Sequence, residues 1–420
     1  MHLGIELLRL LKNMIYNLNK KFNKQCLVKG AVTLLLLFII SANAFAAEVT
    51  SNDEIVSPAD NTDEINTNDY IYRKYDEDTK NKLNDNVINY DEIDDLVHEF
   101  NPTVLSWWNS YRNDKTATEV YDDYMESYDR IMSSADSSES DAVAARLYAQ
   151  AYAIKMLADN NTNDSIINFW NYQIDEIKLC LDAKKKFLNF YITDYNKQIA
   201  ELNVNETKRL ANAANVKYQV GVDTELTYLQ ANKNADDAEA NFDLAVSNHN
   251  VADKNLKISC GKSISNEVEI GSLPNMAVDF NAINISNDIE IAKANNIYLK
   301  IYNRALKNAN TDEMKKYYQI LVDYANEEIE SSVRTYYDAL SNQVNSLLTR
   351  ETTNALMVQQ LTKANNDFSN GRISETDYNT AKYNVDVSNV QVKIQYINVL
   401  SAYEDYKYAI EKGIASARLQ

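Results

Sequence analysis

Histidine and cysteine, which often serve as metal ligands or catalytic groups, are scarce in this sequence. Beyond residue 47 there are two histidines, His98 and His249, and two cysteines. A metal site needs several converging ligands, but His249 falls within a periodic apolar pattern and His98 lies beside Glu99 at a predicted helix end. The sequence has no phosphate-binding loop, supported Ser-His-Asp set or paired-cysteine motif. We expect no enzyme and no cofactor, and we interpret both histidines as packing residues.

The two cysteines, Cys180 and Cys260, lie at similar distances from a predicted turn. They precede and follow Val222 by 42 and 38 residues. If the helices on either side run antiparallel, the two thiols differ in height by about 6 Å. A disulfide between them is compatible with this spacing but needs facing Cβ atoms. Two free thiols are the alternative.

Acidic side chains gather near two glycines, Gly221 and Gly371. In a closed ring of helices they would form an acidic mouth that attracts cations or a basic partner. The alternative is ordinary helix starts, where carboxylates are stabilised by the helix dipole. The residues concerned are Asp223, Glu225, Asp367, Glu375 and Asp377.

The composition favours long helices as the elements that position these residues. The 420 residues include only 7 Gly and 3 Pro, and no proline occurs between residues 103 and 273 or after residue 274. Because Gly and Pro supply tight turns and interrupt helices, so few of them predict an all-α fold.

Two stretches of the chain have similar sequences. YQVGVDTELTYLQA begins at Tyr218, and FSNGRISETDYNTA begins at Phe368, with the glycines 150 residues apart. Glycine tolerates the left-handed angles that end a helix, and Ser374 with Asp377 resembles a capping box that starts the next one. Thr224 with Thr227 is a weaker version. Each stretch therefore predicts a hairpin between two long antiparallel helices.

The helix after each turn keeps a heptad period. The first copy has seam positions at Tyr228, Ala231, Ala235, Ala238, Phe242, Ala245, His249, Ala252, Leu256 and Ser259. The second copy has Tyr378, Ala381, Val385, Ser388, Val392, Gln395, Val399, Ala402, Tyr406 and Ala409. Such seams make helices coil around one another. The fold class predicted is all-α, with two tandem repeats of long antiparallel coiled-coil helical hairpins.

The domain boundaries follow from composition and from the repeat. Residues 1–47 combine basic residues, a short apolar run and Ala44-Phe45-Ala46, which is typical of a signal peptide. We then expect an Asn-rich and acidic flexible leader at 48–89 and an N-terminal helical segment at 90–140. Repeat 1 at 141–261, a linker at 262–287, repeat 2 at 288–413 and a tail at 414–420 follow.

The charge of the chain excludes one class of partner. Residues 1–47 carry six basic and one acidic residue, which leaves 36 basic against 60 acidic residues beyond them. Binding to nucleic acid needs a basic surface to contact phosphates, so no nucleic-acid partner is expected.

These repeats resemble those of the TolC family of outer membrane efflux proteins. The resemblance rests on an aromatic-x-x-Gly followed by Ser or Thr and a spaced Ala, and on a helix that ends in Asn101-Pro102. Its motif residues are Tyr218, Gly221, Thr224 and Ala231, then Phe368, Gly371, Ser374 and Ala381. It implies a homotrimeric helical tunnel, with both turns docking an adaptor (membrane fusion) protein of an inner-membrane transporter.

The sequence departs from that family in one respect. The resemblance implies a membrane β-hairpin near residues 157–170 and again near 306–318, but both stretches are too short for two strands of about 10 residues. Each holds an Asn/Thr/Asp turn, with Thr162 and Thr311 in equivalent places. The β-barrel hairpins are therefore expected to be absent or vestigial.

Two functions remain open at this point. The first is an exported TolC-like duct component of an efflux or secretion system. The alternative is a barrel-less coiled-coil scaffold of the cell envelope, or a cell-wall-associated protein, that conducts nothing. In either case we expect a location in the envelope, at the periplasm and outer membrane or outside the cytoplasmic membrane of a bacterium without an outer membrane.

Overall fold

The computed structural model of this protein describes residues 75–113, 117–265, 267–274 and 283–415. They form two compact units, which we treat separately: residues 117–161, and residues 75–113 with 162–415. The predicted signal peptide, the first part of the predicted leader and the last five residues lie outside the described residues. The described part is almost entirely helical, which confirms the predicted all-α class.

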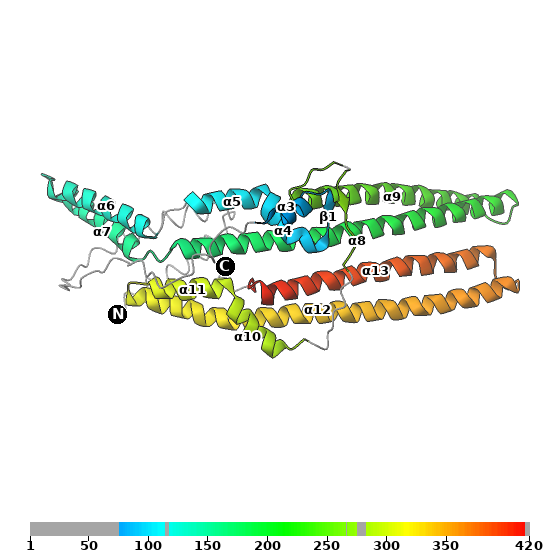
Figure 1. Cartoon of the computed structure of the whole chain (residues 1–420). Helices are drawn as coiled ribbons and strands as arrows, with labels where there is room; N and C mark the ends of the chain where they lie inside the picture. Colours follow the sequence, from blue (N-terminus) through cyan, green and yellow to red (C-terminus); the bar gives the residue numbers. More distant parts are fainter. Residues whose placement is uncertain (1–74, 114–116, 266, 275–282, 416–420) are drawn as a thin grey trace, which may run out of the picture. The chain divides into compact units, whose positions relative to one another are not determined.

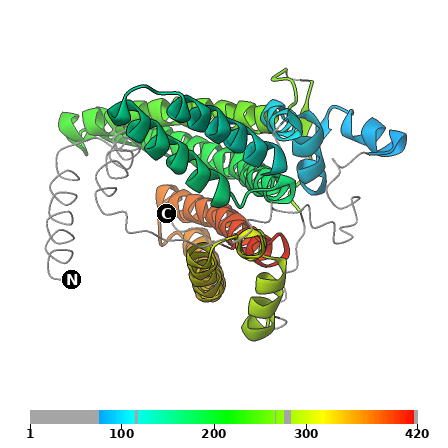
Figure 2. The same cartoon turned by 90° about the vertical axis from the view of Figure 1, so that its left-hand side faces the viewer.

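Two long antiparallel helical hairpins make up most of the larger unit. Helix α8 (Ser165–Gln219) pairs with α9 (Glu225–Ser259), and α12 (Asp312–Ser369) pairs with α13 (Glu375–Glu411). Helix α13 also packs along α8, so the hairpins lie side by side (Figure 1 and Figure 2). The 35 residues of α9 extend about 53 Å. The predicted tandem hairpins are confirmed.

The predicted heptad seams lie at the hairpin interfaces. Every predicted seam residue of α9 and α13 is buried or half-buried. Ala238 and Leu256 are 2% and 0% exposed, whereas Leu244 of the same helix is 59% exposed. The small alanine side chains of the α9 seam let the two helix backbones approach closely.

At the end opposite its glycine turn, each long hairpin packs against two short helices. Helices α4 (Ile93–Phe100) and α5 (Pro102–Asn113) contact α8. Helices α10 (Ile285–Asn295) and α11 (Ile297–Asn308) contact α12. Two hydrophobic core clusters lie in this region, and each draws on both hairpins, since Ile397 and Tyr408 of α13 join the cluster around α8 and Ile174 of α8 joins the cluster around α12.

The junctions between these short helices are built alike. Asn101, between α4 and α5, donates from Nδ2 to the carbonyl of Ser259 (2.8 Å), and its Oδ1 accepts from the Thr103 N–H (2.9 Å). Asn296, between α10 and α11, makes two bonds of the same kind, to the Ala415 carbonyl (2.8 Å) and from the Leu299 N–H (2.9 Å). The pair α4–α5 is therefore the counterpart of α10–α11.

This equivalence changes the extent of the first repeat. Asn101 and Asn296 are 195 residues apart, whereas Gly221 and Gly371 are 150 residues apart. The difference of 45 residues matches the separate unit at 117–161, which follows α5 in the chain. The sequence placed the start of repeat 1 at residue 141, but the structural repeat begins with α4 and contains an insertion.

The inserted unit is a helical hairpin of α6 (Ala117–Asp136) and α7 (Asp141–Asp159). The two helices pack along their length. On α7 the residues at this contact follow a heptad spacing, and Ala151 and Ala158 are fully buried. The complete seam is Ala144, Leu147, Ala151, Ile154 and Ala158.

Ordered structure begins before the end of the stretch predicted as a leader. Helix α3 (Glu77–Leu83) is capped by Asp76, and strand β1 (Val87–Ile88) pairs in parallel with β2 (Glu269–Ile270). The 3₁₀-helix η3 (Tyr90–Glu92) follows. Leu83 and Ile88 are almost completely buried, and this anchoring by two apolar residues explains the difference from the prediction.

Short turns occupy the two places where a β-hairpin was predicted to be missing. Helix α7 ends at Asp159 and α8 begins at Ser165, while α11 ends at Asn308 and α12 begins at Asp312. The only strands in the described ranges are β1 and β2, two residues each. No described helix combines the length and the apolar character needed to cross a membrane.

Candidate functional site: the two hairpin tips

The tips of the two long hairpins, residues 218–228 and 368–378, share one backbone geometry. Gly221 has φ 74°, in the left-handed region. Its N–H donates to the Tyr218 carbonyl (3.0 Å), and the Val222 N–H donates to the Lys217 carbonyl (2.8 Å). These bonds satisfy carbonyls that the helix end leaves free. The second tip repeats them with Gly371 (φ 68°), Phe368, Arg372 and Asp367.

A polar cap starts the second helix at each tip. The Thr224 hydroxyl accepts from the Thr227 N–H (3.2 Å). At the other tip, Ser374 and Asp377 bond each other's backbone N–H groups, so the predicted capping box is present. These caps satisfy donors that the first turn of a helix would otherwise leave free.

An aromatic pair closes each tip. The rings of Tyr218 and Tyr228 stack at 5.6 Å between centroids and 2° between planes. Phe368 and Tyr378 stack at 5.2 Å and 8°. The aromatic residue three positions before the glycine, noted in the sequence motif, thus packs on the tyrosine seven positions after it. The structure brings together within each tip every residue of the predicted docking turns.

The two tips differ in what they expose. The first presents Val220, Val222 and Leu226, which are 68%, 74% and 75% exposed. The second has Asn370 and Arg372, both exposed, and the half-buried Thr376 at the equivalent positions. One tip is therefore apolar and the other polar on the same backbone.

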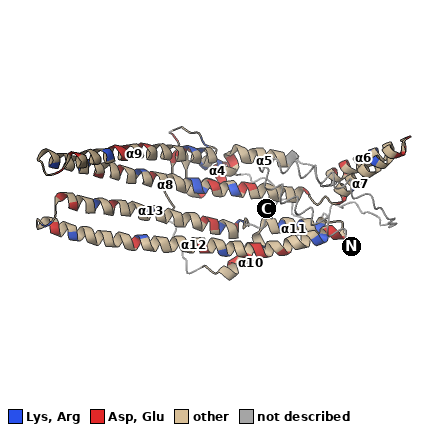
Figure 3. Ribbon diagram, turned by 180° about the vertical axis from the view of Figure 1, so that it is seen from behind, with Lys and Arg blue, Asp and Glu red and all other residues tan. Residues whose placement is uncertain are grey.

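The predicted acidic mouth is partly engaged in local contacts. Asp367 forms an ion pair with Arg372 (3.5 Å), and Asp377 belongs to the capping box. Asp223 is half-buried, while Glu225 and Glu375 are exposed in the first turns of their helices. Acidic and basic residues are interspersed along the hairpins (Figure 3).

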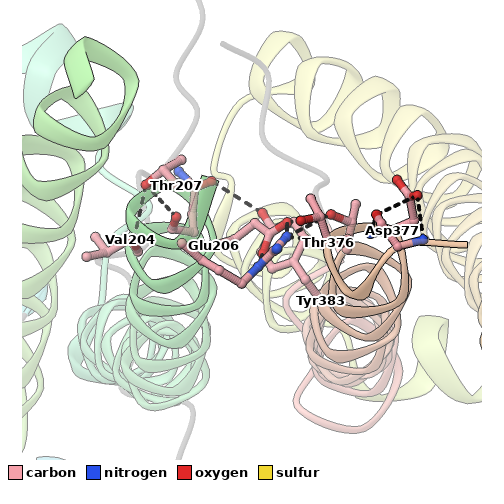
Figure 4. A network of polar contacts seen from close by, with 10 residues as sticks. Val204, Glu206, Thr207, Thr376, Asp377 and Tyr383 are labelled. Atoms are coloured by element: carbon pink, nitrogen blue, oxygen red, sulfur yellow. Dashed lines mark hydrogen bonds and ion pairs between the residues drawn. The ribbon is translucent and has the colours of Figure 1, made fainter. Parts of the chain in front are cut away.

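A polar network near the tips joins α8 of the first hairpin to α13 of the second (Figure 4). Arg209 donates to both Glu206 carboxylate oxygens (2.7 and 2.8 Å) and to the Thr380 hydroxyl (3.0 Å). Thr380 in turn donates to Glu206 (2.7 Å), and Tyr383 donates to Asn203 (3.3 Å). These bonds fix the two hairpins against each other just behind their tips.

The network stabilises the charged form of its carboxylate. Burial raises the pKa of Glu206, but the hydrogen bonds from Arg209 and Thr380 and the charge of Arg209 outweigh it. The pKa of Glu206 therefore lies below its ordinary value. The Glu206 carboxylate raises the pKa of Arg209, mainly through their hydrogen bonds.

The histidines and cysteines lie elsewhere and do not converge. His249 packs on Phe190 in the seam between α8 and α9, with Asp194 3.8 Å away, and burial together with the charge of Lys197 lowers its pKa. Within the described ranges, no group of three or more His, Cys, Asp or Glu side chains is placed to hold a metal ion.

The two cysteines follow the free-thiol alternative of the sequence. Cys180 and Cys260 are both buried, and no disulfide joins them. Burial raises the pKa of the Cys260 thiol to about 12.

Sequence reasoning missed the joints at the other end of the hairpins, which we call the roots. A Cβ added to Gly261 would lie 2.2 Å from the Phe100 carbonyl oxygen, and one added to Gly413 would lie 2.2 Å from that of Asn295. The signal that could have found them is a second pair of glycines, 152 residues apart, each ending a seam helix.

The likeness of this chain to known proteins lies in its fold. No family model and no curated protein sequence matches the chain. Its fold is similar to that of solved outer membrane channels. The outer-membrane channel OprN matches with a TM-score of 0.47 and 10% identity, over 89% of this chain and all of that one.

Two further channels show the same likeness. The outer membrane protein VceC of Vibrio cholerae has a TM-score of 0.40 and 13% identity, over 63% of this chain and 76% of its own. The CmeC outer membrane channel of Campylobacter jejuni has a TM-score of 0.37 and 14% identity, over 64% and 69%. These channels belong to the TolC family, which the sequence motifs had indicated.

Proposed function

We propose that this protein is an exported subunit of a helical duct in the cell envelope, in which copies associate side by side and the tips dock on a partner protein. The observation that carries the proposal is the tip built twice, with an exposed apolar surface at the first copy. The side chains of Val220, Val222 and Leu226 take no part in the caps or in the stacked pair, so their exposure is unexplained by folding alone.

The outer face of α9 supports lateral association. Leu244, Val251 and Ile258 recur every seven residues, and each is more than half exposed. A heptad stripe on the outside of a coiled-coil helix is the pattern that another helix recognises. A neighbouring copy supplies such a helix, and the family resemblance suggests three copies around a tunnel.

Molar mass tests the association. Light scattering of the exported chain without detergent is expected to give a multiple of the subunit mass. The variant Leu244→Ser/Val251→Ser/Ile258→Ser should shift that mass towards the monomer. The variant Asn234→Ser/Asn241→Ser/Asn248→Ser is the control, because it changes exposed positions of the same helix without removing apolar surface. A monomeric natural chain would contradict the duct.

A cellular assay tests the docking. Deletion is expected to raise sensitivity to an exported compound, or to reduce secretion, because the transporter loses its outlet. Complementation with Val220→Glu/Val222→Glu should fail although the oligomer forms, since charges at the apolar tip prevent contact with the adaptor. The matched control is Asn370→Glu/Arg372→Glu at the polar tip, which should retain more activity.

A coiled-coil scaffold of the envelope is the second candidate. It is favoured by the short polar turns that join α7 to α8 and α11 to α12. A scaffold predicts unchanged compound sensitivity and unchanged secretion on deletion, together with a change in envelope integrity or in co-sedimentation with purified cell wall.

A further inference from the structure

The inserted hairpin α6–α7 has a surface that neither its own fold nor the proposed duct uses. One seam of α7, centred on Ala151, packs on α6. A second seam follows the same heptad spacing on the far side of the helix. Its members are Ala142, Ala145, Ala149, Tyr152 and Met156, all exposed or half-buried. A helix with two heptad seams is suited to pack against one helix on each side.

The chemistry of the outer seam favours a helix over a lipid surface. Three of its five residues are alanines, which permit close approach of another helix backbone but anchor poorly in lipid. Residues 117–161 carry nine acidic and three basic residues. Membrane-surface helices instead present lysine and arginine towards anionic headgroups.

The order of residues along the seam indicates which helix fits. The first three members are small, and the last two, Tyr152 and Met156, are large and 68% and 53% exposed. If a second α7 runs antiparallel about the midpoint between residues 149 and 152, Ala149 faces Tyr152 and Ala145 faces Met156. Small residues then meet large ones at both positions, as dense packing requires. A parallel pair would set Tyr152 against Tyr152.

The first helix of the unit is not a competing partner. The outward-facing residues of α6 include Asp122, Glu126 and Asp129, so its far side is acidic and has no second apolar seam. The α6 of a second copy therefore offers nothing that fits the outer seam of α7. The complementary surface is another outer seam of α7.

We propose that the outer seam of α7 is a self-association surface, on which the α7 of a second copy of this chain packs antiparallel about a two-fold axis. The resulting contact is isologous, because the same patch serves both copies. It does not rest on the proposed duct, which uses the outer stripe of α9. The insertion thus links copies through an interface separate from the long hairpins.

Light scattering of the exported chain over a hundredfold range of concentration tests the pairing. The variant Tyr152→Glu is expected to weaken the association step by at least tenfold, since it places two charges in a small apolar seam. Ala149→Tyr should weaken it similarly by setting large residues against each other. The swap Ala149→Tyr/Tyr152→Ala should restore the association to within about threefold, because small again meets large. Circular dichroism checks that each variant is folded.

The outcomes separate this interface from the duct. The α9 variant Leu244→Ser/Val251→Ser/Ile258→Ser should leave the effect of Tyr152→Glu unchanged. The proposal is overturned if Tyr152→Glu leaves the mass unchanged at every concentration or if the swap fails to restore association. Flotation with phosphatidylcholine–phosphatidylglycerol vesicles tests whether the outer seam binds a membrane surface instead. Vesicle binding that Tyr152→Glu abolishes would assign the seam to a membrane surface and overturn the pairing.

Discussion

The two ends of each long hairpin require glycine for different reasons. At the tips, Gly221 and Gly371 have positive φ, and an added Cβ would meet nothing within 4 Å. At the roots, Gly261 and Gly413 have the same backbone angles, but an added Cβ would overlap a carbonyl of the preceding short helices. The tips need glycine only for its backbone angles, whereas the roots also need the missing side chain. A residue other than glycine would therefore meet only backbone strain at a tip, whereas at a root it would also overlap the packed short helix.

Substitution of a root glycine should have the largest effect on stability. For Gly261→Ala we expect the free energy of unfolding to fall by about 4 kcal/mol or more, because the new Cβ would overlap backbone atoms that have no alternative position. Urea denaturation followed by circular dichroism measures it. A loss no larger than that of Gly221→Ala would show that the root can relax.

The polar network behind the tips should give the next largest effect. Arg209→Ala leaves the carboxylate of Glu206, which is only 8% exposed, without its cation. We expect a loss of about 2 kcal/mol in urea denaturation at neutral pH. The control is Lys233→Ala, whose ion pair with Asp237 is exposed and is expected to contribute less than about 0.5 kcal/mol.

The same network gives a pH dependence. Because the folded pKa of Glu206 lies below its ordinary value of 4.5, its contribution is present above that value and is lost as the pH falls through the folded pKa. The difference in unfolding free energy between the natural chain and Glu206→Gln should therefore shrink in acid. A difference that grows as the pH falls would contradict the assignment.

Substitution of a tip glycine should have a smaller effect on stability than substitution of a root glycine. Gly221→Ala should cost about 1 to 2 kcal/mol, the strain of a left-handed residue with a Cβ, since no atom opposes the new methyl group. Gly371→Ala should cost the same, because its surroundings are equally open. Thermal unfolding of both variants measures the two costs. Unequal costs would mean that one tip is closed by contacts the other lacks.

The stacked pairs at the tips should contribute still less. A double-mutant cycle with Tyr218→Ala and Tyr228→Ala is expected to give a coupling of about 0.5 to 1 kcal/mol. The equivalent cycle at Phe368 and Tyr378 should agree with it, because both pairs are stacked at similar distances. Zero coupling at either tip would contradict the stacked geometry.

Thiol labelling compares the accessibility of a root with that of a tip, without measuring stability. Cys260 is fully buried with its pKa raised to about 12, so a thiol reagent at pH 8 should react slowly until urea unfolds the chain. A cysteine introduced by Val222→Cys at the exposed tip should react at once. Rapid labelling of Cys260 in the native chain would show that the root opens.

The features predicted from sequence are those set by local pattern. Gly221 with its caps, the heptad seam ending at Leu256 and the repeat offset all follow from residues close together in the chain. The root junctions were not predicted because an Asn-Pro and an Asn-Ile pair look unlike, although the Asn101 and Asn296 side chains each donate to a backbone carbonyl near a root glycine. An asparagine caps a helix through its side chain, and the residue that follows does not change this role.

The remaining misses depend on contacts between distant parts of the chain. The network of Arg209 and Thr380 joins residues 171 positions apart, and nothing in either segment indicates that α8 faces α13. The insertion at 117–161 was hidden for a related reason. It is helical like the rest of the chain, so no change of secondary structure marks it, and the root junctions together with the separate packing of α6 and α7 show where it interrupts the repeat.

The difference between the tips has a consequence for stoichiometry. In the ring of copies proposed above, there would be twice as many tips as subunits, alike in backbone and alternating in side-chain character. A partner that recognises the shape of the turn can occupy every tip. A partner that needs Val222 and Leu226 can occupy only every second tip. A ratio of two partners to one subunit would therefore indicate recognition of the turn's shape, and a ratio of one to one would indicate recognition of the apolar side chains.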